Sequence, residues 1–140
     1  MPTSSEMDAS STPGNRLNSL ERAIATLRRF TSAPIQDDRD CAGIVQAFEF
    51  TFELAWKCIQ EWVIAAGFEE RGPRASLRAA FRGELILEEG EKMLQSMADD
   101  RNLASHIYRE EEIRAIADRI VGDYVAALES VAQKLRAATG

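Results

Sequence analysis

FEFTFELAWK, residues 48–57, is the stretch with the strongest structural pattern in this chain of 140 residues. With the residues that follow, it places apolar side chains at positions 48, 52, 55, 56, 59 and 63, which is the spacing of one stripe along a helix. Further apolar residues at positions 50, 54 and 58 widen that stripe. A helix that is apolar over most of its circumference is buried from several sides. We therefore expect a helix from about Cys41 to Ala66 that either lies at the centre of a bundle or faces a second subunit with part of its surface.

Other helices are expected on both sides of this one, and each has a start or stop signal. Asn15 is a residue type that caps helix N-termini, Gly67 suits a helix end, and Gly72-Pro73 places Pro in a favoured first turn. The expected helices cover about residues 15–30, 41–66, 73–85, 88–104 and 110–135. No stretch of useful length alternates apolar and polar residues with the period of a β-strand. The predicted fold is all-α, an up-and-down bundle of five antiparallel helices.

Composition sets the domain organisation and excludes several functions. Residues 1–14 are rich in Ser, Thr and Pro and are expected to form a disordered tail, whereas residues 15–138 are expected to form one domain. The net charge of -6 and the pI near 4.9 argue against a general DNA- or RNA-coating protein, so DNA is not an expected partner and any RNA contact must be local. The longest apolar run is far shorter than a membrane span. A cytoplasmic protein is expected.

Neither a metal nor a cofactor is expected. Cys41 and Cys58 are 17 positions apart, without a CxxC pair or a second histidine, which is not the spacing of a zinc site within one chain. We expect both to be buried thiols.

A second stretch, RNLASHIY, residues 101–108, concentrates chemically active groups. It contains the one histidine of the chain, His106, between Arg101 and Tyr108. An imidazole exchanges a proton near neutral pH, and a guanidinium forks onto two phosphate oxygens. On an ideal helix Arg101 and His106 lie about 140° apart, so they can share a site only if the helix ends near Ala104 and the chain turns. The pair suits phosphodiester chemistry.

The same residues resemble the motif of HEPN domains, which is Arg, a polar residue, three spacers and His, in an extended form with a further Tyr. Residues 48–57 are similar to the signature helix of the nucleotidyltransferase substrate-binding protein family, a branch of the HEPN superfamily. With the stretch Asp100-Arg101-Asn102-Leu103 and Ser105-His106 downstream, the likeness covers roughly Arg16 to Leu128.

This resemblance implies a function. It implies a homodimer in which two motifs meet in a cleft and cleave RNA without a metal, with Arg101 and His106 as catalytic residues and Asn102 in support. The implied partner is a minimal nucleotidyltransferase (MNT) antitoxin that adenylylates Tyr108 and blocks the RNA site by charge and volume. The alternative is a non-catalytic substrate-binding subunit of a two-component nucleotidyltransferase.

Several residues near the motif have two interpretations. Arg71, Arg74, Arg78 and Arg82 form a cationic stripe that is either a solvated face beside acidic residues or an RNA-phosphate ridge. Glu49, Glu53 and Lys57 either stabilise their own helix by side-chain pairing or reach the cleft near Arg101. Asp99 or Asp100 can hold Arg101 in place. The tryptophans Trp56 and Trp62 are expected in the core, with stacking on bases as the alternative.

Overall fold

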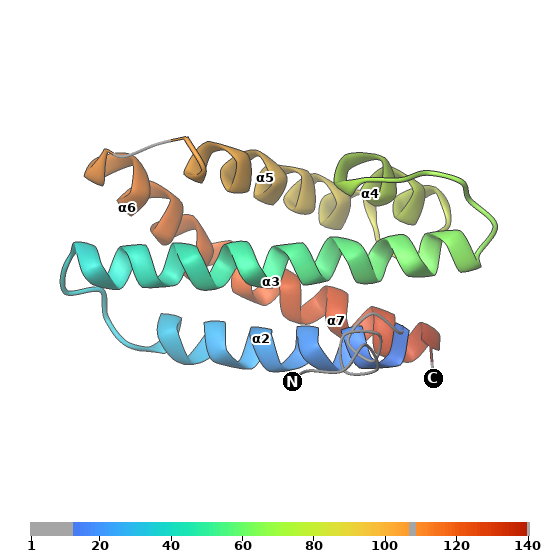
Figure 1. Cartoon of the computed structure of the whole chain (residues 1–140), viewed down its shortest axis with the longest axis horizontal. Coiled ribbons are helices and arrows are strands. Elements are labelled where there is room, and N and C mark those ends of the chain that lie inside the picture. The colour runs from blue at the N-terminus through green and yellow to red at the C-terminus, as the bar shows by residue number, and fades with distance from the viewer. Residues whose placement is uncertain (1–12, 107–108, 140) are drawn as a thin grey trace, which may run out of the picture.

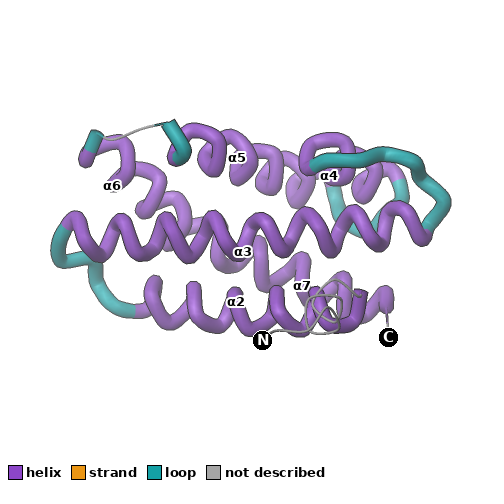
Figure 2. The backbone as a smooth tube through the Cα atoms, viewed as in Figure 1, coloured by secondary structure: helices purple, strands orange, loops and turns teal. Residues whose placement is uncertain are grey.

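The computed structural model describes residues 13–106 and 109–139, and every element within these ranges is a helix (Figure 2). The elements are α2 (Pro13–Ser32), α3 (Asp38–Ala65), α4 (Pro73–Arg82), α5 (Glu88–Ala104), α6 (Glu110–Arg119), η1 (Ile120–Tyr124) and α7 (Val125–Thr139). The last three form one continuous helical run, so the described residues make a bundle of five helical rods without a strand. The predicted all-α fold is confirmed.

Helix α3 lies in the middle of the bundle, as its apolar pattern predicts. Figure 1 shows α2 along one side of it, α4 and α5 along the other side, and the run from α6 to α7 crossing behind it. α3 packs against all of these elements. Its neighbours α2 and α5 run antiparallel to it (Figure 1).

The core is built around the aromatic side chains of α3. Phe48 and Phe52 are 0% and 1% exposed, and their ring centroids lie 6.1 Å apart. On its other side Phe48 stacks against Tyr124 at 5.4 Å, which joins α3 to the final helical run. Aromatic pairs at such distances add to the stabilisation that comes from burial alone.

Most helix ends follow the signals in the sequence. Gly67 adopts a φ of 100° just after α3, a conformation that glycine accepts without strain, and Pro73 begins α4. α3 begins at Asp38, earlier than expected, because the side chain of Asp37 caps it by accepting a hydrogen bond from the Asp40 amide at 2.9 Å. α2 begins at Pro13 and not after Asn15, since Pro is well tolerated in a first turn. Residues 1–12 of the expected tail lie outside the described residues.

The final helix differs from its prediction in one respect. A five-residue π-helix, η1, separates α6 from α7, and the Val125 amide donates to the Ile120 carbonyl five residues earlier. The apolar spacing of the sequence contains no sign of this wider turn.

Both cysteines are buried and free. Burial raises the pKa of the Cys58 thiol to about 11 and also raises that of Cys41. No helix among the described residues combines the length and apolar character needed to cross a membrane.

Candidate functional site

The candidate site lies at the C-terminal end of α5. Ala104 is the last residue of this helix, Ser105 caps it, and the His106 amide donates to the Leu103 carbonyl at 3.0 Å. The Ser105 hydroxyl donates to the Arg101 carbonyl at 3.2 Å. The helix thus ends where the sequence predicted, and the chain turns at His106.

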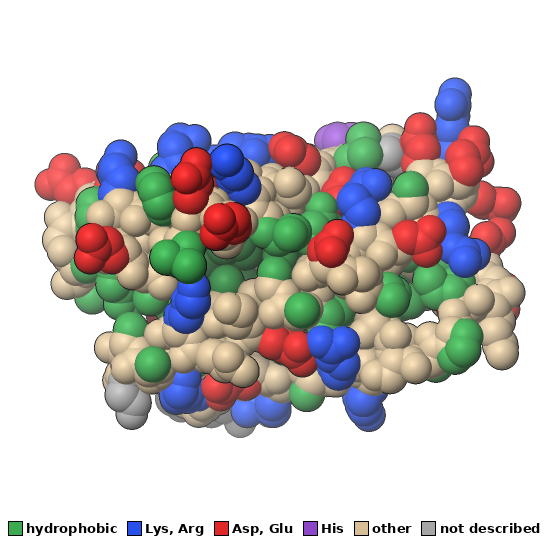
Figure 3. Space-filling view, turned by 180° about the vertical axis from the view of Figure 1, so that it is seen from behind, with side chains coloured by type: hydrophobic (Ala, Val, Ile, Leu, Met, Phe, Trp, Pro, Cys, Tyr) green, Lys and Arg blue, Asp and Glu red, His purple; other side chains and the backbone are tan. Residues whose placement is uncertain are grey.

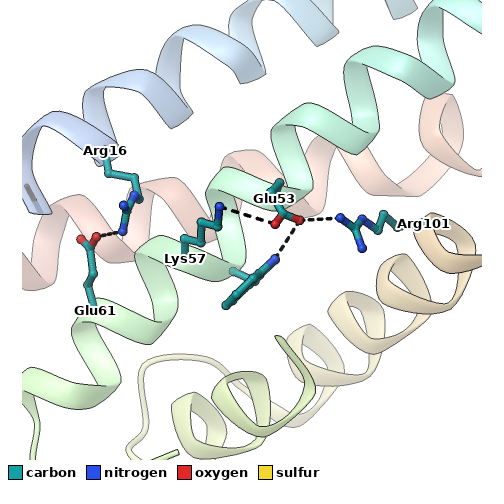
Figure 4. Close-up of polar contacts among 6 residues, drawn as sticks. Arg16, Glu53, Lys57, Glu61 and Arg101 are labelled. Atoms are coloured by element: carbon teal, nitrogen blue, oxygen red, sulfur yellow. Dashed lines mark hydrogen bonds and ion pairs between the residues drawn. The ribbon is translucent and has the colours of Figure 1, made fainter. Parts of the chain in front are cut away.

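Arg101 points from α5 to α3, where it meets a carboxylate (Figure 4). Its Nη2 atom donates to Glu53 Oε2 at 2.9 Å. Trp56 Nε1 donates to the same oxygen at 3.0 Å, and Lys57 Nζ lies 3.6 Å from Oε1. Glu53 is therefore held by its own helix while it holds Arg101. Both interpretations of Glu53 apply at once: side-chain pairing along α3 and contact with the motif.

The surroundings of Arg101 are acidic on the side of α3. Glu49 lies one helical turn before Glu53 and interacts electrostatically with Arg101. Partial burial raises the pKa of Glu49, and the nearby guanidinium opposes that rise. Among the described residues, the Arg101–Glu53 hydrogen bond uses one of the five N–H donors of Arg101, which leaves further donors for an anion.

The motif residues are open to solvent. Asn102, Ser105 and His106 are exposed, and the side chain of Arg101 is 38% exposed. Arg101 hydrogen-bonds to Glu53, and within the described part of the chain no hydrogen bond joins it to His106, although both residues belong to the same last turn and cap. A polymer can reach all of them. Tyr108 lies outside the described residues.

The aspartates beside Arg101 do not hold it, contrary to the alternative raised from the sequence. Asp99 pairs with Arg74 of α4. The carboxylate of Asp100 accepts from Arg119 at 2.7 and 2.8 Å and from the Tyr124 hydroxyl at 2.6 Å. Arg119 and Tyr124 were not predicted as part of the site, because both are far away in sequence and Tyr124 fits the apolar spacing of a core residue.

Two of the four arginines of the cationic stripe, both on α4, are neutralised by ion pairs. Arg74 pairs with Asp99 and also donates to Gln95 at 3.1 Å, and Arg82 pairs with Glu70. Arg78 is exposed. Arg74 and Arg82 therefore fit the interpretation of a solvated face beside acidic residues. Arg78 remains a candidate for binding RNA phosphate.

Seen from behind the view of Figure 1, charges of both signs are interspersed over the surface (Figure 3), so the net negative charge does not form a single field on that face. Among residues 13–106 and 109–139, no three His, Cys, Asp or Glu side chains come close enough together to hold a metal ion. Trp56 and Trp62, which were expected in the core, are partly buried and pack against it.

Comparison with known proteins relates this arrangement to a family. The family model described as "Nucleotidyltransferase substrate binding protein like" matches residues 15–137. The crystal structure of a protein from Thermus thermophilus is similar, with 33% identity, 84% of this chain and 98% of that chain covered, and a TM-score of 0.78. A chain of a mutant MntA-HpeT toxin-antitoxin complex shares the fold at 18% identity, with 89% and 97% covered and a TM-score of 0.74. Among curated proteins, none matches. This chain belongs to the nucleotidyltransferase substrate binding protein like family.

Proposed function

We propose that this chain is a HEPN-type toxin, a metal-independent endoribonuclease of the cytoplasm that a cognate MNT nucleotidyltransferase neutralises. The observation that carries the proposal is the exposed end of α5, where Arg101 keeps free donors and His106 is open to solvent. Family membership and the likeness of the fold to a toxin-antitoxin chain support it.

The proposed reaction needs one group to take a proton and another to give one. A base removes the proton of a ribose 2′-OH, and the oxygen attacks the adjacent phosphorus. The bond from phosphorus to the 5′-oxygen breaks, and an acid protonates that oxygen as it leaves. Arg101 stabilises the charge that grows on the phosphorane, and Asn102 orients His106 or contacts phosphate. His106 serves as either base or acid, but one imidazole cannot do both at once.

A second copy of the chain supplies the missing group in our proposal. The outward side of α3 carries Phe50, which is 65% exposed and lies close in sequence to Glu49 and Glu53. Phe50 borders a hollow of about 360 Å³ that is lined by residues of α2 and α3, among them the small residues Gly43 and Ala47. Exposed aromatic side chains are enriched at protein interfaces. A twin subunit on this side brings two α5 ends towards one cleft.

Loss of RNA cleavage on replacement of His106 tests the enzymatic proposal. Purified wild type is expected to cut single-stranded RNA in the presence of a metal chelator, whereas His106→Ala is expected to lose at least about 10²-fold in rate, the usual scale of acid–base catalysis. Denaturing gels with end-labelled RNA measure both. The control is Gln133→Ala, at an exposed position on α7, which is expected to cleave like wild type. Intact RNA after incubation with wild type contradicts the proposal.

Tyr108 is the proposed site of control. The MNT partner transfers AMP from ATP to the Tyr108 hydroxyl, with loss of its proton and release of pyrophosphate. The bulky anionic nucleotide then occupies the surface beside Arg101 and His106. After coexpression with an MNT partner, mass spectrometry is expected to find AMP on the peptide containing Tyr108 and none with Tyr108→Phe. An unmodified Tyr108 in an active complex contradicts this part of the proposal.

The second candidate is a non-catalytic subunit that binds substrate for a separate nucleotidyltransferase. The family description favours it directly. The two candidates differ in the RNA assay: the binding subunit leaves RNA intact and instead raises the activity of the nucleotidyltransferase, or its affinity for substrate. We prefer the toxin because Arg101 and His106 share one exposed helix end.

A further inference from the structure

Three consecutive residues at the end of α5 are tied to three different parts of the bundle. Asp99 pairs with α4 through Arg74, and Arg101 pairs with α3 through Glu53. Between them, Asp100 is held by the final helical run. The last turn of α5 is therefore fixed from three directions, and the central tie is the most buried.

Asp100, Arg119 and Tyr124 form what we call the Asp100 clamp. The side chain of Asp100 is 8% exposed. Arg119 donates from Nε to Oδ2 at 2.7 Å and from Nη2 to Oδ1 at 2.8 Å, so its fork grips both oxygens. The Tyr124 hydroxyl adds a third hydrogen bond at 2.6 Å. Bidentate bonds between Arg and a carboxylate fix geometry as well as adding energy.

The π-helix explains how both donors reach one carboxylate. Arg119 and Tyr124 are five residues apart: Arg119 directly precedes η1, and Tyr124 is the last residue of η1, which covers Ile120–Tyr124. On an α-helix that separation corresponds to about 140°, so the two side chains would leave on different sides. The wider turn of a π-helix brings residues five apart closer to one side, and such turns are frequent at functional sites. The irregular turn and the clamp thus belong together.

Arg119 and Tyr124 both remain protonated at neutral pH and therefore remain hydrogen-bond donors to Asp100. Tyr124 stacks on Phe48 in the core, and burial together with its bond to Asp100 raises the pKa of the phenol, so it stays a donor at neutral pH. The hydrogen bond to Asp100 raises the pKa of Arg119. Asp100 is buried while the side chain of Arg119 is 43% exposed, and an ion pair of this kind adds little net stability. The ion pair instead fixes the position of Asp100 on α5.

We propose that Asp100, Arg119 and Tyr124 are positioning residues for Arg101, which hold the last turn of α5 so that the free donors of Arg101 meet an RNA phosphate in one orientation. This role rests on the proposed ribonuclease function. The clamp acts through the backbone of its neighbour in sequence and does not touch RNA.

Two conservative variants test the clamp. Asp100→Asn keeps the shape and removes the charge, and Tyr124→Phe keeps the ring on Phe48 and removes one hydrogen bond. Asp100→Asn is expected to lower kcat by about 10²-fold, the effect of a displacement of about 1 Å in a catalytic group, with KM within about twofold. Tyr124→Phe is expected to lower kcat less, in the same direction. If Asp100→Asn does not fold, the kcat of Tyr124→Phe tests the clamp.

The matched control is Glu129→Gln on the same final run of helix, which removes the charge of the carboxylate that accepts a hydrogen bond from Arg28 Nε at 3.1 Å. It is expected to leave kcat unchanged. A second measurement follows the Nε–Hε NMR signal of Arg101, identified by its loss in Arg101→Lys. That signal is expected to shift in the clamp variants and to stay in place in Glu129→Gln.

The two readouts separate the possible failures. A lower melting temperature with unchanged kcat and an unmoved Arg101 signal overturns the clamp, which is then a structural brace. RNA left intact by the wild type overturns the ribonuclease proposal, while the Arg101 signal in Tyr124→Phe and Asp100→Asn still decides whether the clamp positions Arg101.

Discussion

Phe50→Asp is expected to convert a dimer into a monomer and to remove RNA cleavage along with it. Phe50 is 65% exposed in the single chain, and the proposed twin subunit covers it. A carboxylate placed there would be buried without a partner, which destabilises an interface by about 3–5 kcal/mol. Since about 1.4 kcal/mol corresponds to tenfold in affinity, the dissociation constant is expected to rise by about 10²–10⁴-fold. Gel filtration with light scattering over a dilution series measures it.

Leu87→Asp is the matched control for Phe50→Asp. Leu87 is 66% exposed, nearly the same as Phe50, but it stands before the first residue of α5, at the other end of that helix from the candidate site. The control is expected to remain dimeric and to cleave RNA. A wild-type chain that is monomeric at micromolar concentration would contradict the shared cleft, as would a Phe50→Asp chain that stays dimeric.

The fold was predictable because its helices carry local signals. The apolar stripe of α3, Gly67 after it and Pro73 at the next start each determine structure over a few residues. The predicted fourth helix, residues 88–104, has the bounds observed for α5. The π-helix was not predictable, because the apolar spacing carries no sign of it and the carboxylate bound by Arg119 and Tyr124 lies on another helix.

Only the part of the candidate site that is local in sequence was predicted. Arg101 and His106 stand within six residues of each other, so a sequence pattern can find them. The partner of Arg101 is Glu53 at 2.9 Å, on a helix 48 positions earlier, and spacing left open whether Glu53 turned towards α5 or along α3. Spacing also could not divide the arginines of α4 into paired and free, since their carboxylates come from α5 and from Glu70.

The ion pairs around the motif give its charged residues different roles. Glu53 limits where the guanidinium of Arg101 points, and Asp100 limits where its backbone lies. Asp99 is paired with Arg74, which reduces the repulsion that RNA meets beside the site. An acidic protein can in this way offer one local cationic group to a phosphate.

Arg101→Lys is expected to lower the rate of RNA cleavage by about 10²–10³-fold, although the charge is kept. This is the usual loss when one preorganised donor to a transition state is removed. A lysine has a single ammonium and cannot bond to Glu53 while presenting a planar fork to a phosphate. Because Arg101 is 38% exposed and lies outside the buried core, the variant is expected to fold normally. The reduced rate is then a chemical effect, seen in the rate constant for cleavage under single-turnover conditions.

Arg114→Lys is the control for this substitution. Arg114 lies on α6, pairs with Asp118 at 3.3 Å within its own helix, and is 50% exposed. Exposed pairs of this kind contribute less than about 1 kcal/mol, so cleavage and stability should both stay close to wild type. If Arg101→Lys cleaves RNA as fast as Arg114→Lys does, the guanidinium fork is unnecessary. The end of α5 would then act as a general cationic surface, and the geometry held by Glu53 would have no catalytic purpose.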